Sequence, residues 1–256
     1  MNFILTSDIH ANGTTIRSDK ISDTKLLKDY YDKVDLIIIA GDLLDTGANG
    51  EDDLQIVNNC VCIGHHKNEL KSYIDFLNEI DTNWFNSSKI YMCLGNHDTY
   101  TDSLKTKLFR FFHCGKYPPN TIQGLLEQKY GGQLYSFVKK GITFLCLGIY
   151  PDHNAIIFLR EELKKSLHCD PIILFFHYPL TGPYSDWWKD EERVRFYETI
   201  KGKNIICICV GHYHDTYITT WNDIPVISGA GSNTFIKGSF DDTGIKFDII
   251  HSTNDL

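Results

Sequence analysis

The chain has 256 residues, of which 42% are hydrophobic and 23% charged, as in an ordinary globular domain or a tight pair of domains. Its 25 basic and 33 acidic residues give a net charge of -8, which makes a nucleic-acid partner unlikely because non-specific binding needs a basic surface. No apolar run reaches the roughly 18 to 20 residues of a membrane-spanning helix, so no membrane span is expected.

Short apolar runs alternate with amphipathic stretches along the chain, and this alternation predicts the secondary structure. Strands are predicted at residues 2–6, 36–40, 90–94, 133–138, 142–148, 172–176, 205–210, 224–228 and 246–250. Helices are predicted at residues 23–33, 69–80, 121–129, 155–166 and 191–200. The early alternation of strands and helices indicates parallel strands with helical crossovers, and the strand-rich later half suggests a mixed or second sheet.

The N-terminal segment does not look like a signal peptide, because the apolar run at residues 3–5 is followed closely by the polar Ser7 and Asp8. We therefore expect a cytoplasmic protein. The chain has eight cysteines, and several of them lie in apolar runs where cysteine behaves as a small buried hydrophobic residue. Reduced cysteines are expected rather than disulfides.

Two long segments, residues 43–68 and 181–190, fit neither pattern. Loops of this length in a compact domain are often functional, and a solvated excursion with aromatic anchors is an equal alternative. In the second segment, Tyr184, Trp187 and Trp188 are expected to serve packing, with a platform for substrate as the alternative. In the first, the pair His65-His66 is a candidate for the wall of a substrate pocket.

Five predicted strands end abruptly in polar residues that can bind metals. The blocks are Asp8-Ile9-His10, Gly41-Asp42, Gly95-Asn96-His97-Asp98, His177, and Gly211-His212-Tyr213-His214. Ligands of open α/β sheets bind at the carboxyl ends of the strands, so these side chains are candidates to converge. Imidazole, carboxylate and amide oxygen together suit divalent metals such as Zn, Mn and Fe, and a shared carboxylate can bridge two ions about 3.5–4 Å apart.

The ordered set of blocks resembles the calcineurin-like metallophosphoesterase family. The family's order is Asp-x-His, Gly-Asp, Gly-Asn-His-Asp/Glu, a lone His, and Gly-His-x-His, and all five blocks occur in this order within residues 8–214. The resemblance implies an α/β fold, a four-layer αββα sandwich of two mixed sheets flanked by helices, as a single domain over residues 1–256. The chain departs from the family at Phe175-Phe176, which precede His177 where the family has a small residue.

The resemblance also implies roles for individual residues. It implies seven metal ligands: Asp8, His10 and His214 for a first ion, Asn96, His177 and His212 for a second, and Asp42 as the bridge between them. His97 would act beside the metals as an acid or charge stabiliser, with Asp98 orienting its imidazole. The ions are expected to be Mn, Fe or Zn, and Mg or Ni is also compatible with these ligands.

These features predict a hydrolase acting at phosphorus. Two metal ions would lower the pKa of a bridging water, and the resulting hydroxide would attack a phosphoester while the metals neutralise charge on its oxygens. His97 would protonate or stabilise the leaving alkoxide. The expected enzyme is a phosphatase or phosphodiesterase, and its substrate is a small molecule, a phosphoprotein or a phospholipid head group.

Two other functions are alternatives. A non-catalytic scaffold with the same fold would be expected to have lost ligands, whereas here every ligand position is filled. A nuclease is disfavoured by the acidic balance and by the lack of an obvious basic extension.

Overall fold

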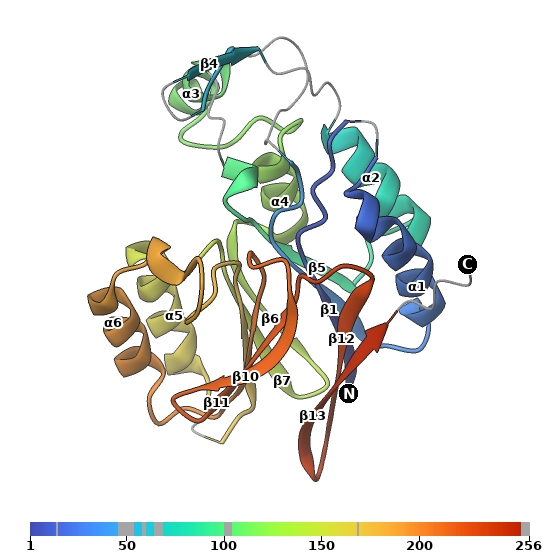
Figure 1. The fold of residues 1–256 in the computed structure, drawn as a ribbon. Helices are drawn as coiled ribbons and strands as arrows, with labels where there is room; N and C mark the ends of the chain where they lie inside the picture. Colours follow the sequence, from blue (N-terminus) through green and yellow to red (C-terminus); the bar gives the residue numbers. More distant parts are fainter. Residues whose placement is uncertain are drawn as a thin grey trace.

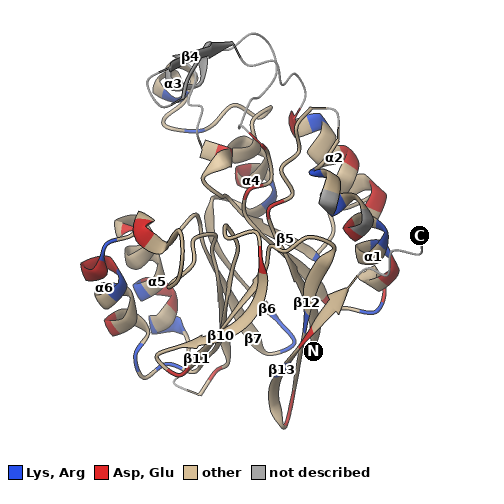
Figure 2. Ribbon diagram, viewed as in Figure 1, with Lys and Arg blue, Asp and Glu red and all other residues tan. Residues whose placement is uncertain are grey.

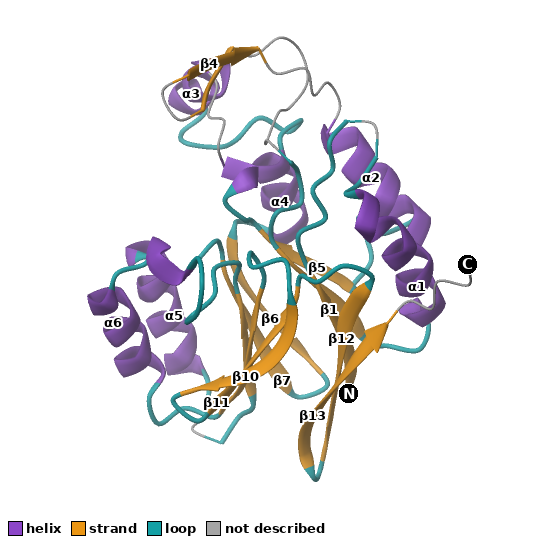
Figure 3. Ribbon diagram, viewed as in Figure 1, coloured by secondary structure: helices purple, strands orange, loops and turns teal. Residues whose placement is uncertain are grey.

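Two β-sheets lie face to face at the centre of the molecule, with helices on their outer faces (Figures 1 and 3). A computed structural model describes residues 1–13, 15–45, 54–57, 60–63, 69–99, 104–167 and 169–251. The first sheet has the strand order β13-β12-β1-β2-β5, and the second has the order β10-β11-β9-β8-β7-β6. Strands β3 and β4 pair separately as an antiparallel hairpin.

Both large sheets are mixed. In the first, β1, β2 and β5 are parallel, β12 pairs antiparallel with β1, and β13 pairs antiparallel with β12. In the second, β7, β8, β9 and β11 are parallel, and β6 and β10 pair antiparallel at the two edges. The strands are β1 (Asn2–Thr6), β2 (Leu36–Ala40), β3 (Leu54–Val57), β4 (Cys60–Ile63), β5 (Ile90–Cys93), β6 (Leu134–Lys139), β7 (Ile142–Leu147), β8 (Ile172–Phe175), β9 (Ile205–Val210), β10 (Thr216–Trp221), β11 (Ile224–Gly229), β12 (Thr234–Asp241) and β13 (Gly244–His251).

Helices cover the outer face of each sheet. The α-helices are α1 (Ile21–Tyr31), α2 (Glu69–Ile80), α3 (Leu104–Phe112), α4 (Ile122–Tyr130), α5 (His153–Lys165) and α6 (Asp190–Ile200), and short 3-10 helices are η1 (Ser18–Lys20), η2 (His97–Thr99) and η3 (Ser185–Trp187). Helices α1 and α2 lie on the side of the first sheet, and α5 and α6 lie on the side of the second (Figure 3). The expected four-layer αββα sandwich is confirmed.

Alternating side chains of the strands divide the core into three apolar layers. In β2, Ile37 and Ile39 face α1 and α2, whereas Leu36 and Ile38 face the second sheet. This division follows from the two-residue repeat of a strand, and both faces are apolar because both are covered. The layer between the sheets fixes how closely they approach, and therefore how closely their strand ends meet.

The predicted elements are confirmed to within two residues at their ends. The prediction missed β10, β12, the hairpin of β3 and β4, and α3. Strand β10 carries Thr216, Thr219 and Thr220 and is mostly exposed, so it lacks the apolar run that identified the others. Most of residues 43–68, including His65-His66, lies outside the described residues.

Six cysteines are free, of which Cys93, Cys146, Cys207 and Cys209 are buried and Cys114 and Cys169 are exposed. No helix among the described residues combines the length and the apolar character that crossing a membrane requires. Lys and Arg alternate with Asp and Glu on the outer helices rather than forming a basic stripe in this view (Figure 2).

Candidate metal centre

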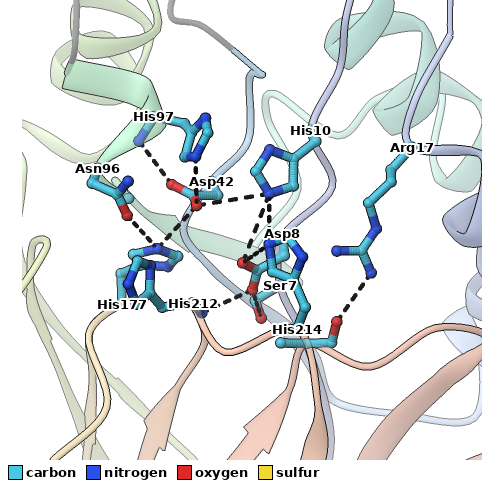
Figure 4. Close-up of polar contacts among 12 residues, drawn as sticks. Ser7, Asp8, His10, Arg17, Asp42, Asn96, His97, His177, His212 and His214 are labelled. Atoms are coloured by element: carbon cyan, nitrogen blue, oxygen red, sulfur yellow. Dashed lines mark hydrogen bonds and ion pairs between the residues drawn. The ribbon is translucent and has the colours of Figure 1, made fainter. Parts of the chain in front are cut away.

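Side chains from the ends of five strands meet at one end of the sandwich (Figure 4). They are Asp8 and His10 after β1, Asp42 after β2, Asn96 and His97 after β5, His177 after β8, and His212 and His214 after β9. The structure therefore brings together every side chain that the sequence predicts as a metal ligand, although the chain separates the first from the last by more than 200 residues.

The side chains fall into two clusters with one common member. Ligand atoms of Asp8, His10, Asp42 and His214 all lie within 4.8 Å of one another, and so do those of Asp42, His177 and His212. Asp42 belongs to both clusters, which is the position that a bridging carboxylate requires.

The first cluster is built around the carboxylate of Asp8. Its Oδ1 lies 3.2 Å from Nε2 of His214 and 3.8 Å from Nε2 of His10. Its Oδ2 accepts hydrogen bonds from Oγ of Ser7 at 2.5 Å and from the backbone N–H of His212 at 3.0 Å. One oxygen is thus held by the protein, and the other is directed at the histidines.

The second cluster is built around the imidazole of His177. Its Nδ1 donates to the carbonyl oxygen of Ala40 at 2.8 Å, which fixes the ring orientation. Its Nε2 lies 3.1 Å from Oδ2 of Asp42 and 3.1 Å from Oδ1 of Asn96. The three atoms that face one another here are a nitrogen, a carboxylate oxygen and an amide oxygen, a donor set suited to Mn, Fe or Zn.

Most of these side chains sit on left-handed backbone. The φ angles are 58° for Asp8, 48° for His10, 49° for Asp42, 72° for His212 and 55° for His214. This region costs about 1–2 kcal/mol for a residue with a side chain, and such strain persists mainly at functional sites. The left-handed turns end the regular strand geometry at the place where the side chains converge.

Two glycines of the strand-end blocks leave room for ligands from other blocks. A Cβ on Gly95 would lie 2.1 Å from Oδ1 of Asp42, and a Cβ on Gly41 would lie 2.6 Å from Nδ1 of His177. Gly41 also has a φ of 85°, which favours glycine. Glycine is therefore required in the Gly-Asp and Gly-Asn-His blocks for packing against a distant ligand.

Burial and opposite charges shift the pKa values in the centre. Burial lowers the pKa of His10, but Asp45 and Asp8 outweigh it and raise the value to about 10. Burial also lowers the pKa of His177, and Asp42 outweighs it and raises the value to about 9. By contrast, burial and the neighbouring His177 lower the pKa of His212 to about 4. The buried carboxylates thus favour positive charge beside them, as they would favour a cation.

Three buried atoms of the centre have no hydrogen-bond partner among the described residues: Nε2 of His212, Oδ1 of Asp8 and Nδ1 of His10. Nδ1 of His10 has Oδ1 of Asp45 at 3.4 Å. An unpartnered buried polar atom is costly, and metal ions would satisfy the other two atoms. The residues present therefore fit a pair of metal ions.

The sequence pattern of the family described as calcineurin-like phosphoesterase matches residues 1–216. The chain belongs to the calcineurin-like phosphoesterase family. No curated protein sequence matches this phosphoesterase.

Solved structures of similar fold include two phosphatases and an anchor protein. A dimetal phosphatase from Danio rerio is 12% identical, with a TM-score of 0.63, and the match covers 100% of this phosphoesterase and 98% of that chain. A purple acid phosphatase from yellow lupin seeds is 11% identical, with a TM-score of 0.64, over 100% of this chain and 52% of the lupin chain. The GAP50 anchor in the inner membrane complex of Plasmodium is 14% identical, with a TM-score of 0.59, over 100% of this chain and 86% of that one. At these identities the likeness shows the fold.

His97 and Asp98 of the phosphoesterase have partners that differ from the expected ones. Nδ1 of His97 contacts the backbone carbonyl of Asp45. The carboxylate of Asp98 accepts from the backbone N–H groups of Gly95 at 2.7 Å, Leu44 at 2.9 Å and Leu43 at 3.1 Å. Asp98 thus fixes the chain after β2, and the Asp45 carbonyl contacts the His97 ring, while the orienting role expected for Asp98 stays a prediction.

Sequence reasoning gave no role to Asp45. Its carboxylate Oδ1 lies 3.4 Å from Nδ1 of His10, so Asp45 contacts both His10 and His97. The available signal was its position three residues after Asp42, on the first turn that leaves β2.

Proposed function

We propose that this protein hydrolyses phosphoesters, as a phosphatase or phosphodiesterase, at a binuclear metal centre. The proposal rests on Asp42, whose carboxylate belongs to both clusters of candidate ligand atoms. Membership of the phosphoesterase family supports it.

Seven residues would hold the metal ions. Asp8, His10 and His214 would bind the first ion, Asn96, His177 and His212 the second, and Asp42 both. Mn, Fe and Zn suit these donors best, with Mg or Ni as further candidates. When bound, the ions would activate a water molecule for attack on phosphorus and neutralise charge on the phosphoryl oxygens.

His97 would assist the departure of the leaving group. Its side chain is 32% exposed, and its Nε2 lies 4.0 Å from Oδ2 of Asp42. Because Nδ1 faces a carbonyl oxygen, it must carry a hydrogen. Nε2 therefore donates to a leaving oxygen only when the ring is protonated, and as an imidazolium it also stabilises the negative charge that develops there.

The site is proposed to act on a substrate in the cytoplasm. Buried and exposed free cysteines support a reducing compartment. The substrate classes compatible with the metal centre are small phosphoesters, phosphoproteins and phospholipid head groups.

One activity panel tests the proposal. The full chain is loaded with Mn, its metal content is measured, and hydrolysis of an aryl monophosphate, an aryl phosphodiester, a cyclic nucleotide and a phosphopeptide is compared. Turnover of at least one ester by the metal-loaded protein, lost on chelation, is the expected result. Two bound ions without turnover of any substrate would overturn the proposal in favour of a scaffold.

A further inference from the structure

A hollow opens directly beside the candidate metal centre, and aromatic rings form part of its wall. Its volume is about 310 Å³, and the described residues that line it are Asp42, His97, Tyr184, His212, Tyr213 and His214. A phosphoryl group held at the metals would therefore have its ester substituent in contact with this hollow.

The aromatic wall of the hollow is defined as Tyr184 and Tyr213, and Trp187 lies beside it without lining the hollow. Two of these three rings are unusually exposed. The side chain of Tyr184 is 62% exposed and that of Trp187 is 57% exposed, whereas the next residue, Trp188, is only 1% exposed. Large exposed aromatic residues beside a site commonly mark ligand contact. The segment thus combines the two roles that sequence reasoning treated as alternatives, with Trp188 serving packing and its neighbours facing solvent.

The segment that carries the wall is firmly anchored. Nε1 of Trp188 donates to the carbonyl oxygen of Pro179 at 2.9 Å, and its ring packs against Phe176 and Phe196. The guanidinium of Arg193 contacts the carbonyl oxygen of Ser185 and lies 5.7 Å from the centre of the Trp188 ring. Rings that are held in place before binding lose little conformational entropy when a ligand packs on them.

Backbone strain places the Tyr184 ring at the hollow. Tyr184 has a φ of 60°, a conformation that aromatic residues rarely adopt. Its ring lies 5.8 Å from that of Tyr213 and meets the imidazole of His212 edge-on at 6.1 Å. Trp187 stacks on Tyr178 at 5.9 Å behind it. The strain is localised at a residue that lines the hollow, where strain is most often functional.

Apart from the histidines proposed for the metal centre and for catalysis, the described residues that line the hollow offer no cationic partner for a second anionic group. Among the described residues that line it there is no Lys or Arg. Arg17, drawn in Figure 4, donates to the carbonyl oxygen of Ala230 at 3.1 Å. The chemistry of the wall therefore favours a flat, uncharged group next to the phosphoryl group.

We propose that the aromatic wall binds an aromatic ring on the group esterified to the phosphate, so that the preferred substrates are small phosphoesters with an aryl or nucleobase-like ring. This inference rests on the proposed function. Stacking of one ring on an aromatic side chain changes affinity by about tenfold.

A matched pair of substrates tests the inference. Benzyl phosphate and cyclohexylmethyl phosphate have similar alkoxide leaving groups and differ in whether the ring is flat and aromatic, and their methyl diesters serve if the enzyme is a diesterase. We expect kcat/KM to favour the benzyl ester by about tenfold, mainly through KM. The ratio is taken within one variant, so changes in folding or metal content cancel.

Variants assign the preference to the wall. Tyr184→Ala is expected to reduce the ratio to near one, and Tyr184→Phe to keep it, because the ring and not the hydroxyl carries the effect. Phe112→Ala removes a ring that is 73% exposed on α3 and does not line the hollow, and it should leave the ratio unchanged. An unaltered ratio in Tyr184→Ala, or equal use of both esters by the natural chain, overturns the inference.

Binding without turnover separates this inference from the proposed function. The metal-loaded chain is titrated calorimetrically with benzylphosphonate and cyclohexylmethylphosphonate. Tighter binding of the aromatic phosphonate without hydrolysis of any ester would sink the proposed function and keep the ring site. Hydrolysis with no preference for the aromatic ring, in either assay, would keep the proposed function and overturn the ring site. If the chain neither binds the phosphonates nor hydrolyses any ester, both proposals are rejected.

Discussion

The two sheets contribute different chemistry to the candidate metal centre. Strands β1, β2 and β5 of the first sheet supply both proposed carboxylate ligands, Asp8 and Asp42, together with His10 and Asn96, whereas β8 and β9 of the second sheet supply only histidines. Each cluster of ligands contains residues from both sheets. The centre is therefore a product of how the sheets pack, and neither sheet alone provides a complete set.

The two sides also differ in their access to solvent. On the first sheet, Asp8 is fully buried, Asp42 is 1% exposed and His10 is 6% exposed, whereas His214 on the second sheet is 49% exposed. The negative charge is thus enclosed, whereas His212 and His214 of the second sheet line the hollow and His177 is buried beneath them. We expect substrate to approach from the His212–His214 side.

The largest effect is expected at the residue shared by both clusters. Asp42→Ala removes a ligand from each ion, so hydrolysis should fall by about a thousandfold and bound metal should fall below one ion per chain. Activity assays and elemental analysis of the purified variant measure this. Asp248→Ala, an exposed carboxylate on β13, is the control. Full activity with two ions in Asp42→Ala would show that the first sheet does not bridge the metals.

A substitution of His97 tests whether the residues that follow the first-sheet strands take part in catalysis as well as in metal binding. His97→Ala should lower kcat by roughly a hundredfold, because the leaving oxygen loses its proton donor, while metal content stays unchanged. The deficit should shrink with substrates whose leaving group is a weak base, which need no proton. Equal deficits for strong and weak leaving groups would contradict the role of His97.

A substitution of Gly95 tests whether the position of Asp42 depends on the space that Gly95 leaves beside it. Gly95→Ala places a Cβ 2.1 Å from Oδ1 of Asp42, so metal affinity should fall by about ten- to a hundredfold. Gly132→Ala is a matched control, since its Cβ would meet only the carbonyl oxygen of Leu134 at 3.4 Å. Metal titrations compare them, and unchanged affinity in Gly95→Ala would mean that Asp42 is free to move.

The last prediction concerns pH and separates the histidines of the centre. The raised pKa values of His10, about 10, and His177, about 9, mean that both rings carry a proton near neutral pH without metal, whereas the lowered value of His212, about 4, means that it does not. Metal binding must expel the protons, so affinity should rise by about tenfold per pH unit and per proton between about pH 6 and pH 9. Calorimetry in buffers of different ionisation enthalpy would count the released protons, and a flat profile would contradict the protonated rings.

Sequence patterns identified the elements whose faces are both covered, and they failed where one face is open. Strands β1, β2 and β9 are continuous apolar runs because they pack on both sides, whereas β10 has a polar, exposed face at the edge of its sheet. Helix α3 was missed although Leu104, Leu108, Phe111 and Phe112 recur at helical spacing, and Leu108, Phe111 and Phe112 are exposed in the structure.

The convergence of the proposed ligand residues could be predicted because the ends of the strands fix where these side chains meet. Asp8, Asp42 and His177 each follow an apolar run directly, so the fold fixes their positions to within a residue. The partners of Asp98, the contacts of Asp45 and the orientation of Tyr184 depend instead on the path of loops after the strands. Loop paths are set by backbone hydrogen bonds and left-handed residues that composition does not encode.

The left-handed backbone of the proposed ligands has a consequence for how the site can change. Glycine adopts these φ angles at little cost, so replacing the half-exposed His214 by glycine would remove a proposed ligand and at the same time relieve local strain. Loss of the metal centre would then bring a gain in the stability of the metal-free fold. Continued selection for metal binding is therefore needed to keep these residues, and a descendant freed from catalysis would be expected to lose them quickly.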